Sequence, residues 1–256
     1  MLNATVVKRV NITDSLFIMG VKPDFEVPNF LPGQYVALGL PASALRMGGY
    51  LDENEAVSDK ILKRTYSIGS SPDQRDLIEF YVAVVPTGIL TPRLQLLKEG
   101  DRVYIAPKVT GKFTIEGLSE DKNLILISTG TGIAPYISMI RTENIWTANR
   151  KITLLHGVRY TADLAYAEEL KNLQNKNSNF SYYTTVSRAE ESYTGEKGYV
   201  QKYLKDEVVK LNPEKDHVFL CGNPAMIDEL ESYLCQNSYT VHSSKTPGNL
   251  HLEKYW

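Results

Sequence analysis

The chain has 256 residues, which is enough for one large domain or two smaller ones. Hydrophobic residues make up 43% of it and charged residues 23%, a balance typical of a globular protein with a full core. The formal net charge of −2 excludes a general attraction to nucleic acid or to an anionic membrane, and no apolar run is long enough to span a bilayer. Its two cysteines, Cys221 and Cys235, are too few for a four-cysteine iron–sulfur cluster or a disulfide framework. The start also lacks the apolar core of a secretion signal, so we expect a cytoplasmic protein.

The first half has the pattern of a small antiparallel β-barrel. Short runs rich in β-branched and aromatic residues alternate with turn signals such as Leu31-Pro32-Gly33. They predict strands at 5–10, 15–21, 34–40, 64–69, 78–85 and 102–106. Regular spacing of this kind favours a barrel, with one helix predicted at 91–98.

Residues 42–63 interrupt this pattern. They contain two adjacent glycines followed by an acidic cluster, and we interpret them as a long surface loop. An inert insertion is favoured here over a functional lid.

Two short motifs in this half are candidates for binding a phosphate-bearing ligand. On a predicted strand, Arg64 and Tyr66 share one face while Ser67 lies on the other, which places a cation beside an aromatic ring. In the second motif a turn at Gly88 leads into the helix, with Thr91 as its predicted N-cap. A half-buried strand with a solvated arginine, and a simply capped helix, are the alternatives.

A strand, a glycine turn and a helix follow one another in 124–141. An apolar run at 124–127 predicts a buried strand, Gly130-Thr131-Gly132 breaks it, and isoleucines then recur at helical spacing from Ile133 onward. This order aims backbone N–H groups at an anion and lets the anion approach without a Cβ in its way. The motif lacks the third glycine of the dinucleotide fingerprint and the Lys-Ser or Lys-Thr pair of a phosphate loop, so an ordinary tight turn is the alternative.

The second half alternates strands with helices. Strands are predicted at 152–157, 180–186 and 217–220, and helices at 162–173, 199–209 and 225–235. This alternation predicts a parallel sheet with helices on both faces and a ligand at the carboxyl ends of its strands. Those ends carry Thr131, Arg159, Ser187-Arg188 and Cys221-Gly222-Asn223. Two arginines and a serine there predict a phosphomonoester site, with solvated loop residues as the alternative.

Taken together, these motifs resemble the ferredoxin–NADP reductase superfamily. The motifs occur in the family's order and approximate spacing: Arg64-x-Tyr66-Ser67, Gly88-x-Leu90-Thr91, Gly130-Thr131-Gly132-Ile133-Ala134-Pro135 and Cys221-Gly222-Asn223-Pro224-x-Met226. The ending Glu253-Lys254-Tyr255-Trp256 is similar to the bacterial branch. The resemblance implies two domains, an FAD-binding antiparallel β-barrel at 1–117 and an NADP-binding α/β domain with a parallel sheet at 118–256.

The resemblance also implies roles for individual residues. It implies Arg64 at the FAD pyrophosphate, Tyr66 against the isoalloxazine and Ser67 near its N5. Further FAD contacts are implied for Thr65, Tyr81, Gly88, Leu90 and Thr91. At the end of the chain, Tyr255 is expected to cover the flavin ring and Trp256 the adenine side.

For the nucleotide, the resemblance implies Thr131 between the two cofactors and Cys221 close to the nicotinamide, with Gly222 and Asn223 beside it. Arg159, Ser187 and Arg188 match positions that grip the 2′-phosphate of NADP. Ser67, Cys221 and Tyr255 are the expected catalytic residues, in the sense that they shape hydride transfer and do not act as nucleophiles.

Two departures from the family's pattern stand out. Relatives often carry a further arginine where this chain has Glu196-Lys197, so Lys197 is expected to replace that charge while Glu196 opposes a phosphate. Residues 42–63 also form a longer loop than usual, which affects the expected docking surface of a carrier protein. The four histidines show no metal-ligand spacing and receive no role, and no metal is expected.

The resemblance implies electron transfer between NADP(H) and ferredoxin or flavodoxin. NADPH gives a hydride to flavin N5, and the reduced flavin releases electrons singly to the carrier. The candidate contacts to an acidic carrier are Lys8, Arg9, Lys60, Lys63 and Arg64. We expect a monomer. The alternatives are the reductase component of an oxygenase, a free-flavin reductase, and a non-catalytic subunit that binds the nucleotide.

Overall fold

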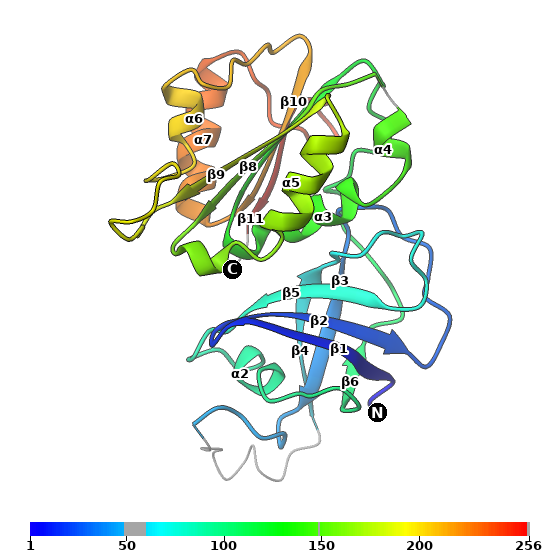
Figure 1. Cartoon of the computed structure of the whole chain (residues 1–256). Helices are drawn as coiled ribbons and strands as arrows, with labels where there is room; N and C mark the ends of the chain where they lie inside the picture. Colours follow the sequence, from blue (N-terminus) through cyan, green and yellow to red (C-terminus); the bar gives the residue numbers. More distant parts are fainter. Residues whose placement is uncertain (49–59, 148, 255–256) are drawn as a thin grey trace. The chain divides into compact units, whose positions relative to one another are not determined.

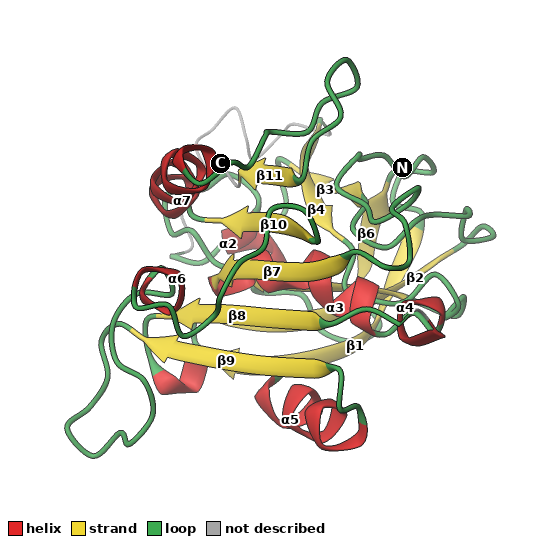
Figure 2. Cartoon of the chain, turned by 90° about the horizontal axis from the view of Figure 1, so that it is seen from above, coloured by secondary structure: helices red, strands yellow, loops and turns green. Residues whose placement is uncertain are grey.

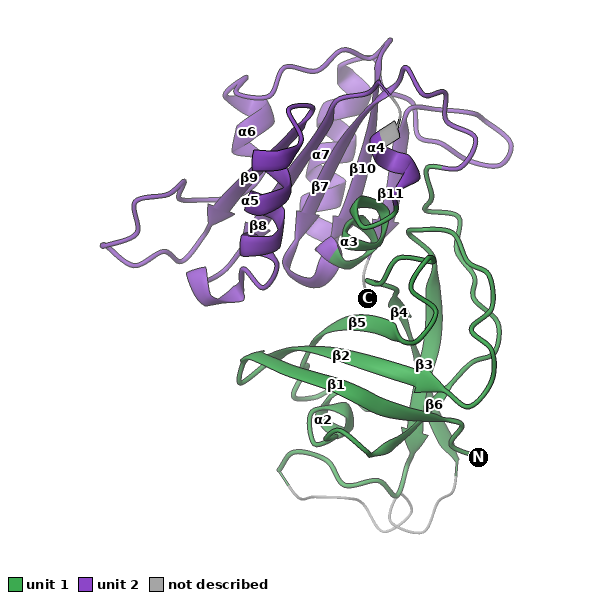
Figure 3. Cartoon of the chain, turned by 45° about the vertical axis from the view of Figure 1, so that its right-hand side comes forward, with its two compact units in different colours: residues 1–115, 134–142 green, residues 116–133, 143–256 purple. Residues whose placement is uncertain are grey.

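The computed structural model describes residues 1–48, 60–147 and 149–254. The chain divides into two compact units (Figures 1 and 3). Unit 1 comprises Met1–Ile115 and Ala134–Thr142, and unit 2 comprises Glu116–Ile133 and Glu143–Trp256. The helix after the glycine turn thus belongs with unit 1. The proposed domain boundary after residue 117 stays a prediction.

Unit 1 is built on six antiparallel strands in the order β4-β3-β6-β1-β2-β5, as predicted for the first half. The strands are β1 (Ala4–Thr13), β2 (Leu16–Pro23), β3 (Tyr35–Pro41), β4 (Ile61–Ser67), β5 (Ile78–Ala83) and β6 (Arg102–Ile105). Alternate side chains of β2, such as Phe17, Met19 and Val21, pack into one apolar core. The predicted antiparallel barrel architecture is confirmed.

The helix predicted at 91–98 is shorter than expected. It is α2 (Thr91–Leu94), and its N-cap residue is Leu90, so the prediction that Thr91 caps the helix is wrong. The Thr91 hydroxyl instead accepts a hydrogen bond from the backbone N–H of Val85 at 2.9 Å. The hydroxyl therefore closes the turn before the helix and does not bind the helix's own first N–H groups.

A buried arginine anchors the beginning of the long loop after β3. Arg93 is 1% exposed, and its guanidinium donates to the carbonyl oxygens of Ala42 at 2.8 Å, of Ala44 at 3.1 Å and of Ile89 at 2.5 Å. These bonds compensate the cation for its lost hydration. The loop's first residues are thus tied to the turn before α2, whereas residues 49–59 of the predicted loop lie outside the described residues.

Helix α3 (Ala134–Ile140) is held to the strands of unit 1 by a buried carboxylate. Glu79 of β5 is 3% exposed and pairs with Arg141, just after α3, and with Lys8 of β1, each at 2.7 Å. Burial alone raises the pKa of Glu79, but the positive charges of Arg141 and Lys8 outweigh it and lower the pKa below its ordinary value. The carboxylate is therefore ionised and links α3 to two strands.

We predict that Glu79→Gln lowers the free energy of unfolding by about 2–4 kcal/mol, because it leaves two cations beside a neutral amide in a buried site. Asp24→Asn is the matched control, since Asp24 pairs with Arg102 on the surface. That control should change stability only slightly. Urea denaturation of both variants measures the difference, and equal losses would contradict the anchoring role of Glu79.

Unit 2 contains a parallel sheet of five strands in the order β11-β10-β7-β8-β9 (Figure 2). The strands are β7 (Asn123–Thr129), β8 (Ile152–Val158), β9 (Phe180–Val186), β10 (Asp216–Gly222) and β11 (Leu250–Lys254). Helices α6 (Lys202–Lys205) and α7 (Pro224–Gln236) share an apolar core with β7 and β10, where Ile127, Leu220 and Leu230 are fully buried. The predicted α/β architecture is confirmed.

Several elements of unit 2 differ from the predictions. The predicted helix 162–173 is a short 3₁₀ turn, η2 (Thr161–Asp163), followed by α5 (Ala167–Lys176). The predicted helix 199–209 shortens to α6, while α4 (Asn144–Thr147) and strand β11 were not predicted. Within the described residues, no helix has the length and apolar character needed to cross a membrane.

Three of the four histidines cluster on β10, β11 and the turn before β11. The His217 Nδ1 atom lies 3.0 Å from His251 Nε2, and the His251 ring stacks on Phe219 and on His242. Burial, followed by the nearby rings of His242 and His217, lowers the pKa of His251 to about 3. Burial also lowers the pKa of His217, with contributions from Lys122, His242 and Arg150 against Asp216. His251 and His217 are therefore folded in their neutral forms.

We predict that this cluster makes the free energy of unfolding decrease as the pH is lowered. An unfolded histidine has a pKa near 6.5. Below that pH the unfolded state therefore binds a proton, whereas folded His251 stays neutral down to a much lower pH. Stability is fully present above about pH 6.5 and is lost as the pH falls toward about 3. Between about pH 7 and about pH 4.5 the loss from His251 should be on the order of 2–3 kcal/mol. Urea denaturation at both pH values should show a flatter dependence for His251→Gln, and an unchanged dependence would contradict the assignment.

Candidate functional site

The strand order of unit 2 reverses between β7 and β10. Chain order runs outward from β7 through β8 to β9 on one side, and through β10 to β11 on the other. In such a sheet the connections leave the carboxyl ends of the two central strands in opposite directions and open a crevice for a ligand. The 3₁₀ turn η1 (Gly130–Ile133) follows β7 there, and Asn223 follows β10.

The turns after these two strands approach each other more closely than side chains allow. A Cβ on Gly132 would lie 2.4 Å from the carbonyl oxygen of Cys221. Gly222 has φ +130°, and a Cβ there would lie 2.5 Å from Thr129 Oγ1. Only glycine fits both places. Of the predicted nucleotide contacts, Thr131, Cys221, Gly222 and Asn223 are thus brought together.

Two polar side chains hold the turn after β10. The Thr129 hydroxyl accepts a hydrogen bond from the backbone N–H of Asn223 at 2.9 Å. The Asn223 side-chain oxygen accepts from Ala225 N–H at 2.9 Å and from Met226 N–H at 3.4 Å, so it caps α7. Asn223 is therefore engaged in shaping the crevice.

Cys221 is fully buried and lies beside a carboxylate that the sequence analysis did not assign. The Sγ atom is 3.9 Å from Glu253 Oε1, and the two residues are direct partners in the β10–β11 register. This neighbour was missed because β11 was not predicted. A polar residue following the apolar pattern at 250–252 was the available signal.

The two predicted arginines lie at the carboxyl ends of β8 and β9. The Arg188 N–H donates to the Arg159 carbonyl at 2.8 Å, so their backbones are adjacent. Both side chains are exposed, and Arg188 Nη1 donates to Tyr160 Oη at 3.2 Å. This hydrogen bond raises the pKa of Arg188. Ser187 lies between the same strands and donates from its hydroxyl to Val158 O at 3.3 Å.

Lys197 was expected to replace a phosphate-binding arginine, and that role stays a prediction. Its Nζ donates to the carbonyl oxygens of Glu190 at 3.1 Å and of Glu191 at 3.3 Å. The charge of Glu196 is instead balanced by Lys202, 2.5 Å away. Lys202 was not recognised from the sequence because it lies six positions after Glu196, at the start of α6.

The predicted FAD residues Arg64, Thr65, Tyr66 and Ser67 lie on β4 in unit 1. Arg64 is exposed, Ser67 is buried, and Tyr66 is half-buried with its ring edge-on to Phe80 at 6.4 Å. Burial raises the pKa of Tyr66 well above its ordinary value, so the phenol stays neutral.

The remaining predicted FAD contacts in unit 1 lie on β5 and on the turn before α2. Tyr81 is buried on β5. The Leu90 side chain packs in the apolar core, so only the backbone of Leu90 could contact a ligand. Gly88 N–H donates to Val85 O at 2.8 Å within the turn that Thr91 closes. Tyr255 and Trp256 lie outside the described residues.

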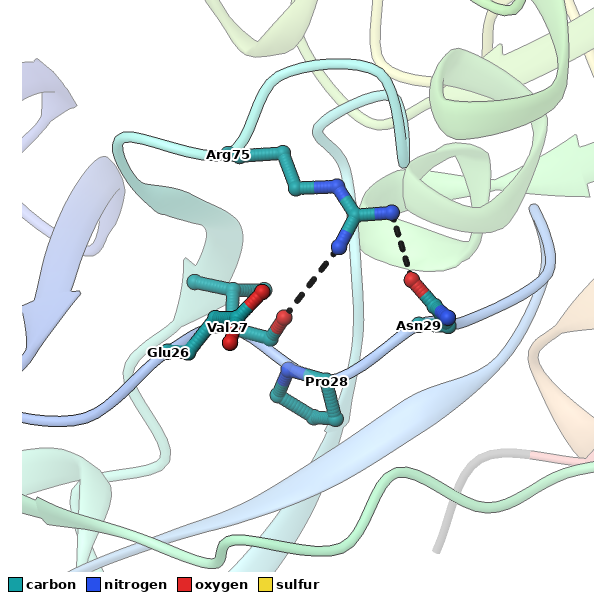
Figure 4. Close-up of a pocket in the computed structure, with 5 residues that line it drawn as sticks. All are labelled: Glu26, Val27, Pro28, Asn29 and Arg75. Atoms are coloured by element: carbon teal, nitrogen blue, oxygen red, sulfur yellow. Dashed lines mark hydrogen bonds between the residues drawn. The ribbon is translucent and has the colours of Figure 1, made fainter.

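A surface cavity of about 230 Å³ in unit 1 does not involve the predicted residues (Figure 4). It is lined by Glu26, Val27, Pro28, Asn29 and Arg75. Arg75 donates to Asn29 Oδ1 at 2.5 Å and to Val27 O at 3.5 Å. The Arg75 guanidinium is therefore hydrogen-bonded to other residues that line the cavity. We assign this cavity no role. Among the described residues, no group of histidine, cysteine and acidic side chains could hold a metal ion.

Comparisons with known proteins show what this chain is similar to. A family model described as the oxidoreductase NAD-binding domain matches residues 126–232. The flavodoxin/ferredoxin–NADP reductase of Escherichia coli (strain K12) is 33% identical over 98% of this chain and 97% of its own length. That of Buchnera aphidicola subsp. Baizongia pistaciae is 30% identical over 100% of this chain and 98% of its own length.

A solved structure shares the fold. The crystal structure of a ferredoxin NADP⁺ reductase from Neisseria gonorrhoeae with bound FAD and NADP matches with a TM-score of 0.82 at 23% identity. The match covers 98% of this chain and 97% of that one. The predicted two-domain fold and the predicted resemblance are both confirmed: the chain belongs to the flavodoxin/ferredoxin–NADP reductase family of oxidoreductases.

Proposed function

We propose that this chain uses FAD and NADP(H) to pass electrons to ferredoxin or flavodoxin. The proposal depends on one observation. The turns at Gly132 and Gly222 meet at the strand reversal, and the exposed Arg159 and Arg188 lie at the carboxyl ends of the neighbouring strands. Family membership supports the reaction class, and the finer choice of carrier is our proposal.

The residues of unit 2 fit a phosphate-bearing dinucleotide. Where Gly130 would carry a Cβ there is no heavy atom within 4 Å, so a phosphate has room to approach the backbone. Arg159 and Arg188 supply planar guanidinium groups suited to a 2′-phosphate. Glu196 is neutralised by Lys202, which removes an obstacle to that phosphate and supports a preference for NADPH.

The residues of unit 1 fit a flavin dinucleotide. Arg64 is exposed on β4 for contact with a pyrophosphate, and half-buried Tyr66 offers a neutral ring for packing against an aromatic system. When bound, FAD supplies the hydride acceptor and the source of single electrons. In this scheme neither Ser67 nor Cys221 acts as a nucleophile. Cys221 and Glu253 together shape the nicotinamide end of the crevice.

Docking of an acidic carrier draws on fewer basic residues than the sequence suggested. Lys8 is paired with Glu79, and Arg9 donates to the carbonyl oxygens of Leu94 and Gln95. Because Arg64 is assigned to the flavin, we propose that Lys63, which is exposed on β4, provides the main contact together with Lys60. A monomeric state and a cytoplasmic location stay predictions.

We predict that the purified protein is yellow, contains FAD, and oxidises NADPH with ferricyanide as an artificial acceptor. Side-by-side assays with ferredoxin and flavodoxin should give carrier reduction that weakens as salt is raised, because the contact is electrostatic. A colourless protein that also does not bind added FAD would refute the proposal. Activity with ferricyanide and free flavin but with neither carrier would favour the free-flavin reductase alternative.

We also predict that Arg188→Ala raises KM for NADPH by about tenfold and KM for NADH less than about twofold, because only NADPH loses a charge-assisted contact. Tyr160→Phe is the matched control, since it removes the hydrogen-bond partner of Arg188 and keeps the guanidinium. Steady-state kinetics with both nucleotides measure the effect. Equal increases for NADPH and NADH would show that Arg188 does not bind the 2′-phosphate.

A further inference from the structure

A fully buried histidine lies beneath the glycine turn of unit 2. His156 is in the middle of β8, beside Ser128 of β7, and its ring is 0% exposed. The Nε2 atom lies 3.0 Å from the carbonyl oxygen of Gly130. A carbonyl oxygen can only accept, so the ring carries its proton on Nε2 and donates it to Gly130.

The other ring nitrogen of His156, Nδ1, is also buried and has no hydrogen-bond partner among the described residues. Burial lowers the pKa of His156 to about 4, against a smaller opposite effect of the Gly130 hydrogen bond. The imidazole is therefore neutral near neutral pH, with one donor in use. Leaving a polar nitrogen unpaired costs free energy that an aliphatic side chain in this sheet would avoid. Packing alone therefore does not account for a histidine at this position.

The hydrogen bond orients the peptide that joins Gly130 to Thr131. No described peptide bond is cis, and in a trans peptide the C=O and the N–H point in opposite directions. With the Gly130 oxygen directed at the buried ring, the Thr131 N–H points away from His156. Gly130 is the first residue of the 3₁₀ turn η1, so the turn and the His156 donor together hold the Gly130 carbonyl in this direction.

We propose that His156 is a positioning residue for the nicotinamide dinucleotide: it fixes the peptide between Gly130 and Thr131 so that the Thr131 N–H faces the dinucleotide's diphosphate. This inference rests on the proposed function. His156 touches neither substrate nor cofactor in this role. It acts through the backbone of the turn, and the adenosine end of the nucleotide, bound by the strand ends with Arg159 and Arg188, should not depend on it.

The test compares two ligands by calorimetry on the FAD-loaded protein. NADP⁺ carries the full diphosphate and the nicotinamide, whereas 2′,5′-ADP carries the adenosine end with its 5′-phosphate and lacks the nicotinamide-side phosphate. His156→Leu should weaken NADP⁺ binding by about tenfold and change 2′,5′-ADP binding less than about twofold. His156→Gln, whose amide N–H can replace the Nε2 donor, should restore NADP⁺ binding to within about threefold of the wild type.

Thr185→Val is the matched control, because Thr185 is another fully buried polar residue of the same sheet, with no partner for its Oγ1 among the described residues. It should bind both ligands like the wild type. Unchanged NADP⁺ affinity in His156→Leu, or equal losses for both ligands, would overturn the inference. Wild-type protein that fails to bind NADP⁺ would instead overturn the proposed function.

A measurement on the wild type keeps the inference testable if His156→Leu does not fold. Nitrogen-15 NMR of the imidazole should show the tautomer protonated on Nε2, in the free protein and with NADP⁺ bound. A ring protonated on Nδ1 would break the hydrogen bond to Gly130 and overturn the inference. In the same spectra, the Thr131 amide resonance should shift on addition of NADP⁺ and not on addition of 2′,5′-ADP.

Discussion

The backbone contact between the two turns at the strand reversal constrains everything else in unit 2. At Gly132 and Gly222 the chains approach so closely that any Cβ would collide with Cys221 or Thr129. The β7–β10 ladder holds the two strands side by side, and this contact keeps the turns after them close where their connections diverge. The crevice at the reversal therefore depends on two positions where a side chain is absent, and on neighbours that hold the turns against each other.

Those neighbours are polar side chains that bind backbone groups. Thr129 accepts from the N–H of Asn223, and His156 donates to the carbonyl of Gly130. Unit 1 follows the same principle, since Arg93 binds the backbone of the loop after β3 and Glu79 binds the cations that fasten α3. A buried polar group is costly unless it is paired, so each of these pairs specifies one arrangement of a loop that apolar packing alone would leave open.

The fold was largely predictable because most elements carry a strong local pattern. Ten of the eleven strands in the described residues were anticipated to within a few residues, including β7, which was recognised from the run before Gly130. Strand β11 was missed because its apolar residues are few and lie next to a turn-rich stretch. Helix α6 is short because only Tyr203 and Leu204 reach the core, so tertiary packing ends it before the helical pattern does. The expected cap at Thr91 failed because Val85 offers its hydroxyl a better-placed partner.

By itself, the sequence determined most of the strands and helices and the glycine positions, because these depend on periodicity and on residue type at short range. The roles of individual residues toward a cofactor came from the resemblance of its motifs to a family. The tertiary structure decided which of these residues meet. It placed Cys221 beside Glu253, brought Lys197 to the backbone of Glu190, gave Glu196 a partner in Lys202, and put the His156 ring within hydrogen-bond distance of Gly130. These pairs join residues from different elements, and no local pattern records which strand will lie next to which or in what register.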